Sequence, residues 1–104
     1  ANRGKTSVVC DFNDPAELDR LRGLIDGADV VVENFKAGGL RRFGLDYATL
    51  SVRNPRLVYA SVTGFGQNGP RATQPGYDFL IQGMGGLMSV TGRPDGEDGG
   101  GRTL

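Results

Sequence analysis

The chain has 104 residues, enough for one small domain, and its twelve basic and twelve acidic side chains cancel without forming a block of like charge. This balance disfavours a nucleic-acid partner, which needs a basic face, and no apolar run approaches the roughly 20 residues of a membrane helix. Because the chain contains no histidine, Ser-His and Cys-His catalytic pairs are excluded, and the lack of the commonest zinc ligand speaks against a metal site.

The first elements predicted are a strand and a helix. Residues 6–12 are β-branched and apolar, which predicts a buried strand. A helix follows, with Asp14 as its N-cap, Pro15 at its first position and Glu17 placed to close a capping box. Its leucines and isoleucine recur every three or four positions, and Gly27 near its end predicts a left-handed residue.

Two further strands are predicted with short helices between them. Residues 29–35 are apolar on both faces in the centre, as parallel strands between helices tend to be. Helical turns are expected over residues 40–44 and again from Asp46, until Asn54-Pro55 ends the second. Residues 56–63 are the third strand.

The last third of the chain is richer in glycine. Residues 64–76 predict a loop, residues 77–88 an apolar helix weakened by three glycines, and residues 91–102 a polar loop. Strands alternating with helices indicate an α/β fold with a parallel sheet and flanking helices. Ligands of such sheets bind beyond the carboxyl ends of the strands, at residues 11–14, 33–39 and 64–69 here.

The end of the second strand carries the most suggestive side chains. Asn34, Phe35 and Lys36 place an amide, an aromatic face and a cation in one turn, which suits a purine and its phosphates. On the chemistry of these residues alone, the favoured interpretation is an ordinary strand-end turn in which Asn34 bonds its own backbone. Residues 64–69 match the spacing G-x-G-x-x-G, but Pro70 follows where a dinucleotide site needs a helix, so a tight loop is the better interpretation.

Three single residues each allow two interpretations. Arg42 either reaches a phosphate or is a solvated helix charge. Asp78 is either a catalytic acid or a first-turn helix residue, and the second use is commoner. Cys10 is either a nucleophile or a small buried apolar residue; as the lone cysteine it forms no intrachain disulfide, which favours a reducing, cytoplasmic setting.

Five segments together resemble the class III CoA-transferase family, which includes formyl-CoA, carnitine and bile-acid CoA-transferases and the α-methylacyl-CoA racemases. Each motif is loose alone, but their order and spacing across essentially the whole chain are specific. They are NRGK at residues 2–5, ADVVVENF at 28–35, NPRLVY at 54–59, GFGQNGP at 64–70, and PGYD at 75–78 continuing to GGLMSVTG at 85–92.

The resemblance implies a Rossmann-like large domain in a homodimer of interlocked chains. It also implies acyl-CoA and carboxylic acid substrates, with coenzyme A carried as the thioester and an aspartate that attacks it. In this family that aspartate follows the glycine-rich loop, and would lie just past Leu104. We therefore expect residues 1–104 to be an internal fragment of the CoA-binding large domain, inactive alone.

The resemblance also assigns CoA contacts. Alternatives within it are a racemase-type acyl-CoA isomerase and a fragment without CoA affinity; Tyr77 stands where the racemases carry a catalytic histidine, which favours a transferase. Pro75 replaces a lysine of some members, and Asn13 replaces a residue that is often basic. The residues implied to contact CoA are Asn34, Phe35, Lys36, Arg42, Cys10, Asn13, Gln74 and Tyr77.

Overall fold

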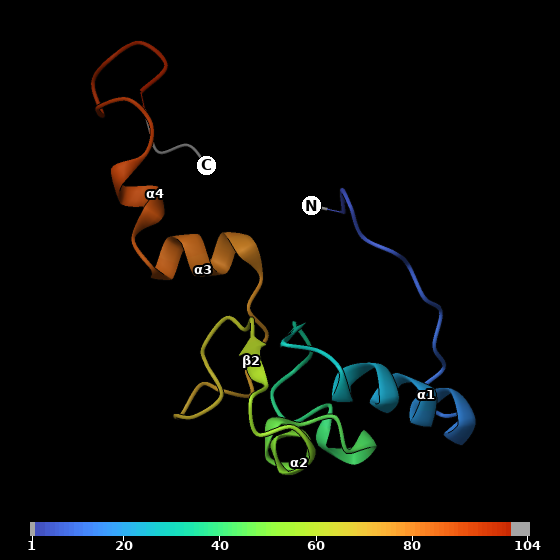
Figure 1. Cartoon of the computed structure of the whole chain (residues 1–104). Helices are drawn as coiled ribbons and strands as arrows, with labels where there is room; N and C mark the ends of the chain where they lie inside the picture. Colours follow the sequence, from blue (N-terminus) through green and yellow to red (C-terminus); the bar gives the residue numbers. More distant parts are fainter. Residues whose placement is uncertain (1, 101–104) are drawn as a thin grey trace. The chain divides into compact units, whose positions relative to one another are not determined.

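The structure is a computed structural model that describes residues 2–100, and these form two compact units that divide after Ser61. The first unit holds a small sheet and two α-helices, and the second holds two further α-helices (Figure 1). In the first unit the elements are α1 (Pro15–Asp26), β1 (Val30–Glu33), the 3-10 turn η1 (Arg41–Phe43), α2 (Tyr47–Arg53) and β2 (Val58–Ser61). In the second they are α3 (Asp78–Met84) and α4 (Leu87–Val90).

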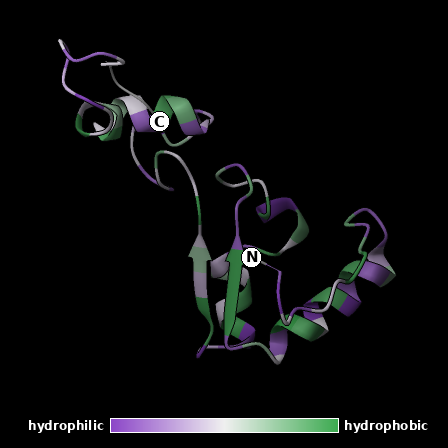
Figure 2. Cartoon of the chain, turned by 90° about the horizontal axis from the view of Figure 1, so that it is seen from above, coloured by the Kyte–Doolittle hydropathy of each residue, from purple (hydrophilic) through white to green (hydrophobic). Residues whose placement is uncertain are grey.

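The sheet confirms the predicted α/β fold with parallel strands. β1 and β2 run in the same direction, with Val30 opposite Val58 and Glu33 opposite Ser61, and Figure 2 shows the two arrows side by side. The expectation that β1 is apolar on two covered faces is only half right. Val31 packs against the core, whereas Val30 and Val32 are 53% and 68% exposed.

The predicted strand over residues 6–12 is wrong for this structure. In the described part of the chain the paired strands are β1 and β2, and residues 6–9 are exposed, Val9 to 90%. A strand needs a backbone partner for its N–H and C=O groups, and β propensity alone does not supply one. The segment ends at Asp11, whose N–H donates to the Glu17 carboxylate instead.

The start of α1 follows the prediction closely. Asp14 is the N-cap, and its Oδ1 accepts a hydrogen bond of 2.8 Å from Ala16 N. Glu17 reaches past the cap to Asp11, so the capping-box prediction has the right residue and the wrong donor. Gly27 caps the other end at φ −94°, not in the left-handed region, which corrects that prediction too.

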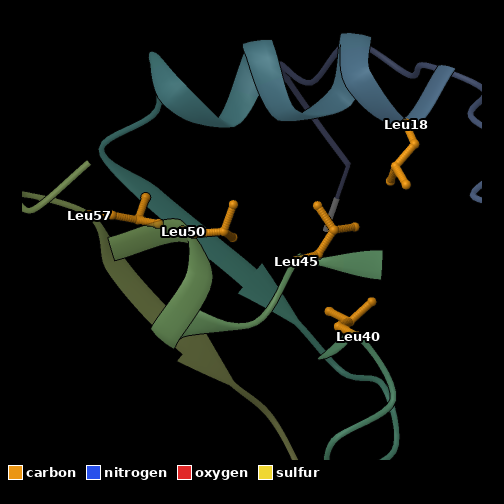
Figure 3. Close-up of a cluster of buried hydrophobic side chains, with 5 residues drawn as sticks. All are labelled: Leu18, Leu40, Leu45, Leu50 and Leu57. Atoms are coloured by element: carbon orange, nitrogen blue, oxygen red, sulfur yellow. The ribbon is translucent and has the colours of Figure 1, made fainter. Parts of the chain in front are cut away.

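The core of the first unit is a cluster of leucines (Figure 3). Its centre is Leu50 of α2, which is 1% exposed. Burying such a side chain stabilises the fold by about 1.5–3 kcal/mol, so this cluster is the main source of stability in the unit. The buried leucines are Leu18, Leu40, Leu45, Leu50 and Leu57.

In the second unit, the first glycine of the G-x-G-x-x-G segment serves packing. A Cβ placed on Gly64 would overlap the Cα of Gly76, so the two backbones touch where a side chain has no room. The next helix, α3, begins only at Asp78, as expected for a loop that is not a dinucleotide fingerprint.

The predicted helix over residues 77–88 is two helices. α3 ends at Met84, and Gly86, at φ 84°, precedes α4 in a conformation that glycine adopts without strain (Figure 1). The predicted loop over residues 91–102 is free of helix as far as residue 100, and its last two residues lie outside the described part. Among residues 2–100, no helix is long and apolar enough to cross a membrane.

Candidate functional site

An open depression of about 530 Å³ lies in the first unit, where the turn after β1 meets the approach to α1. It is formed by two of the regions predicted to bind a ligand, residues 11–14 and 33–39, together with the η1 turn. Of these two regions, only residues 33–39 lie at the end of a strand in the described structure. Its lining residues are Phe12, Asn13, Phe35, Lys36, Gly38, Gly39, Arg42 and Phe43.

The turn after β1 is held by its own backbone. Gly39 N donates to Lys36 O at 2.7 Å, and Gly38 between them has φ 74°, a left-handed conformation that suits glycine. The Glu33 carboxylate accepts a hydrogen bond of 2.7 Å from Phe35 N, so a glutamate, not Asn34, fixes the entry to the turn. Phe35 and Lys36 are thereby placed at the rim of the depression.

Three aromatic rings form one wall. Phe12 lies between the other two, with its centroid 5.9 Å from that of Phe35 and 5.2 Å from that of Phe43, the second pair edge to face. Phe35 is 47% exposed, so apolar ring surface is open to a ligand. Such surfaces stack on planar heterocycles.

The charge of the depression is positive. Lys36 and Arg42 line it, and none of its lining residues is acidic. The Arg42 Cζ lies 4.4 Å from the centroid of Phe43, a cation–π contact that holds the guanidinium beside the aromatic wall. Rings beside two cations suit a ligand that combines a planar base with phosphate groups.

The structure brings half of the predicted site residues together. Asn13, Phe35, Lys36 and Arg42 line the same depression, although they come from three separate segments. Asn34 is exposed next to them but does not line it.

The other predicted contacts lie elsewhere. Gln74 and Tyr77 belong to the second unit, where both are exposed, Tyr77 to 72%. Cys10 lines a much smaller hollow against α1, and its Sγ donates to the main-chain O of Glu17 at 3.5 Å. Desolvation and the nearby Glu17 and Asp11 charges raise the pKa of Cys10, which favours the thiol over the reactive thiolate.

Phe12 and Phe43 were missed by the sequence analysis. Phe12 was counted as the last apolar residue of a buried strand, and Phe43 as the apolar side of a helical turn. Their distinguishing signal is that both are aromatic and adjoin a predicted ligand contact, Asn13 and Arg42 respectively. Among residues 2–100, no group of three or more His, Cys, Asp or Glu side chains is arranged to hold a metal ion.

Comparison with known proteins gives a consistent result. The chain is 55% identical over 92% of its length to a succinate–glutarate CoA-transferase of Agrobacterium fabrum, and 46% identical over 91% to an acetyl-CoA:oxalate CoA-transferase of Acetobacter aceti. Among solved structures, a CaiB/BaiF family protein from Brucella suis matches 90% of the chain at 54% identity, with a TM-score of 0.83.

These matches cover only part of each relative. The chain spans 24% of both transferases and 25% of the Brucella protein, about a quarter of their length. The family model, by contrast, matches nearly all of this chain, over residues 1–100, and is described as CoA-transferase family III. The chain belongs to CoA-transferase family III.

Proposed function

We propose that this chain is part of the CoA-binding domain of an enzyme that moves CoA from an acyl-CoA thioester to a carboxylic acid. The observation that carries the proposal is the depression in which aromatic rings and two cations converge without an acidic lining residue. CoA offers the complementary chemistry, an adenine ring joined to phosphate groups. The family membership and the names of the two transferases support the reaction class.

Each lining side chain has a role in this proposal. The exposed ring of Phe35, backed by Phe12, stacks on the adenine. Arg42 binds phosphate oxygens with its planar guanidinium, and Lys36 adds a second positive charge. Asn13 offers a neutral amide, of which one donor already bonds Asp11 Oδ1 at 3.1 Å.

The remaining predicted contacts stay part of the proposal. Asn34 follows β1 next to the depression, and Gln74 and Tyr77 of the second unit are further residues that contact CoA in this proposal. Cys10 contributes to the adenine end as a small, uncharged neighbour of Asp11. The whole enzyme is a cytoplasmic, interlocked homodimer with a Rossmann-like large domain, of which residues 1–104 are a part.

The acceptor that we propose is a small dicarboxylic acid. The Agrobacterium relative is named for succinate and glutarate, and the Acetobacter relative for acetyl-CoA and oxalate; succinate, glutarate and oxalate are dicarboxylic acids. An acceptor of this kind carries one carboxylate to take the CoA and a second that remains charged, which gives the enzyme a handle for selection.

The attacking aspartate of this reaction lies outside these 104 residues. Its carboxylate adds to the thioester carbonyl and expels the CoA thiolate, leaving a mixed anhydride; the thiolate then forms a thioester with the enzyme and frees the donor acid. The acceptor carboxylate finally takes over the CoA in the same way. Residues 1–104 contribute binding of the nucleotide, which keeps the released thiolate in place between steps.

Substitution of one arginine tests the binding site. In the full-length enzyme, Arg42→Ala removes a charge-assisted contact and raises the KM for the CoA thioester about tenfold or more. Arg41→Ala is the matched control, because Arg41 is the preceding residue of the same turn and does not line the depression. Equal KM values for Arg42→Ala and the unaltered enzyme would contradict the proposed site.

A second measurement tests the reaction. Steady-state assays should show CoA passing from succinyl-CoA to glutarate in the full-length enzyme, and no turnover by residues 1–104 alone. Exchange of the α-proton of a 2-methylacyl-CoA, without transfer of CoA, would replace the transferase by a racemase. Turnover by the 104-residue chain would disprove an external nucleophile.

A further inference from the structure

A side chain outside the depression fixes the turn that carries Arg42. Arg22 lies on α1, four positions after the buried Leu18, and is half-buried. Its Nη2 donates a hydrogen bond of 2.6 Å to the main-chain O of Phe43, a residue 21 positions later. This bond connects α1 directly to the η1 turn.

The bond bears on the candidate site through Phe43. The main chain of Phe43 accepts the bond from Arg22, while its ring lies 4.4 Å from the Arg42 Cζ. Buried Leu40 and Leu45 flank the turn, and Leu45 N donates to Leu40 O at 3.2 Å. The turn is thus flanked on both sides by core leucines, and its last residue, Phe43, is held by one guanidinium.

On the basis of the proposed function, we propose that Arg22 is a positioning residue for the phosphate-binding side of the CoA site. It holds η1 in the conformation in which Arg42 faces the ligand, and it is not itself a lining residue. A turn ordered in advance avoids part of the entropy cost that CoA binding would otherwise incur. A lysine carries the same charge but lacks the planar fork, so it is a poor replacement.

A double-mutant cycle in the full-length enzyme tests this role. The dissociation constant for free CoA is measured by calorimetry for the unaltered enzyme, Arg22→Met, Arg42→Met and the double variant. We expect Arg22→Met to raise Kd about threefold to tenfold, the equivalent of ordering one side chain. In the Arg42→Met background it should have no further effect, because Arg22 acts through Arg42.

A control separates position from charge. Arg20→Met removes the same charge from the same helix, and Arg20 neither lines the depression nor bonds η1 in the described structure. It should leave Kd unchanged. If Arg22→Met weakens CoA binding equally with and without Arg42, or leaves Kd unchanged, the positioning role is wrong.

Further variants separate a failure of Arg22→Met to fold, and a failure of the proposed function, from a failure of the positioning role. Should Arg22→Met fail to fold, Arg22→Lys replaces it; a Kd raised at least about threefold supports the role, and an unchanged Kd overturns it. At saturating substrate the kcat of folded Arg22 variants should equal that of the unaltered enzyme. Failure of the unaltered enzyme to bind CoA, or an Arg42→Met variant with normal Kd, refutes the proposed function itself, whatever Arg22 does.

Discussion

The two units differ in how they use their apolar residues. The first unit buries five leucines contributed by α1, α2 and the connections around them, and these make up the core cluster (Figure 3). In the second unit, α3 and α4 contain no fully buried residue, and Phe79, Leu80 and Met84 of α3 are 65%, 46% and 51% exposed. The first unit therefore forms a core, whereas the helices of the second unit leave large apolar side chains exposed.

The difference shows that a periodic pattern of apolar residues in a helix stabilises the fold only where a partner surface covers those residues. α1 is twelve residues long and contributes Leu18 to a cluster with four leucines from later positions. α3 has seven residues, fewer than an isolated helix needs to be stable in water. We infer that the first unit holds most of the free energy of folding of this chain. The first prediction below tests that inference, and the next two test one interaction in each unit.

The largest effect is expected in the leucine core. Leu50→Ala creates a cavity at the least exposed core residue and should lower the free energy of unfolding by about 2–5 kcal/mol. Leu87→Ala, at a residue that is 49% exposed in α4, serves as the control and should cost far less. Denaturant titration measures both values. Equal losses in the free energy of unfolding would show that the apolar residues of the second unit contribute as much stability as the leucine core.

Next comes the close backbone approach in the second unit. Gly64→Ala places a Cβ onto Gly76 and forces the two segments apart, at a cost of about 1–3 kcal/mol. Gly83→Ala is the control, since its Cβ would meet Met88 Sδ at 3.7 Å in ordinary contact and would favour the helix by up to about 1 kcal/mol. Hydrogen exchange should show faster exchange in α3 for the first variant and slower exchange for the second. Changes of the same sign would contradict the packing role of Gly64.

The smallest effect concerns the pH dependence of the first unit. Burial, followed by the charges of Glu33 and Asp46, raises the pKa of Tyr59 above its ordinary 10.0, and its hydroxyl donates to Leu45 O at 2.8 Å. Since the folded state favours the protonated phenol, this stabilisation is complete below pH 10 and is lost as the pH rises through the folded-state pKa. Thermal melts of the unaltered chain should therefore fall at alkaline pH more steeply than those of Tyr59→Phe. Parallel curves for the two proteins would show that the Tyr59 hydroxyl does not contribute to the loss of stability at alkaline pH.

The predictable part of the fold is the part set by local interactions. Asp14 and Pro15 start α1 as their residue types require, and α2 begins directly after Asp46 and ends before Asn54, as predicted. The segment before Asp11 was predicted wrongly, because a strand depends on a neighbour that local sequence does not reveal. The break at Gly86 was underestimated for a different reason, since its left-handed φ only becomes apparent in the folded backbone.

The candidate site was predictable to the extent that strand ends meet at one edge of a sheet. That rule, with the family resemblance, identified Phe35, Lys36 and Arg42. The contact of Phe12 with Phe35 and the bond from Arg22 to Phe43 could not be predicted, because each joins residues that lie far apart in the sequence. Sequence reasoning thus identified the polar groups better than the side chains that hold them.

The attachment of Asp11 to Glu17 has a consequence for dynamics. With the Asp11 N–H bound to Glu17 and Asp14 capping α1, Phe12 and Asn13 are tethered to the first helical turn. Fraying of that turn moves Phe12 and Asn13, and with them one rim of the depression. A ligand that contacts this rim binds only the unfrayed turn and therefore suppresses the fraying. Hydrogen exchange of the amide protons at the beginning of α1 would then report whether a ligand occupies the depression, although these amides do not line it.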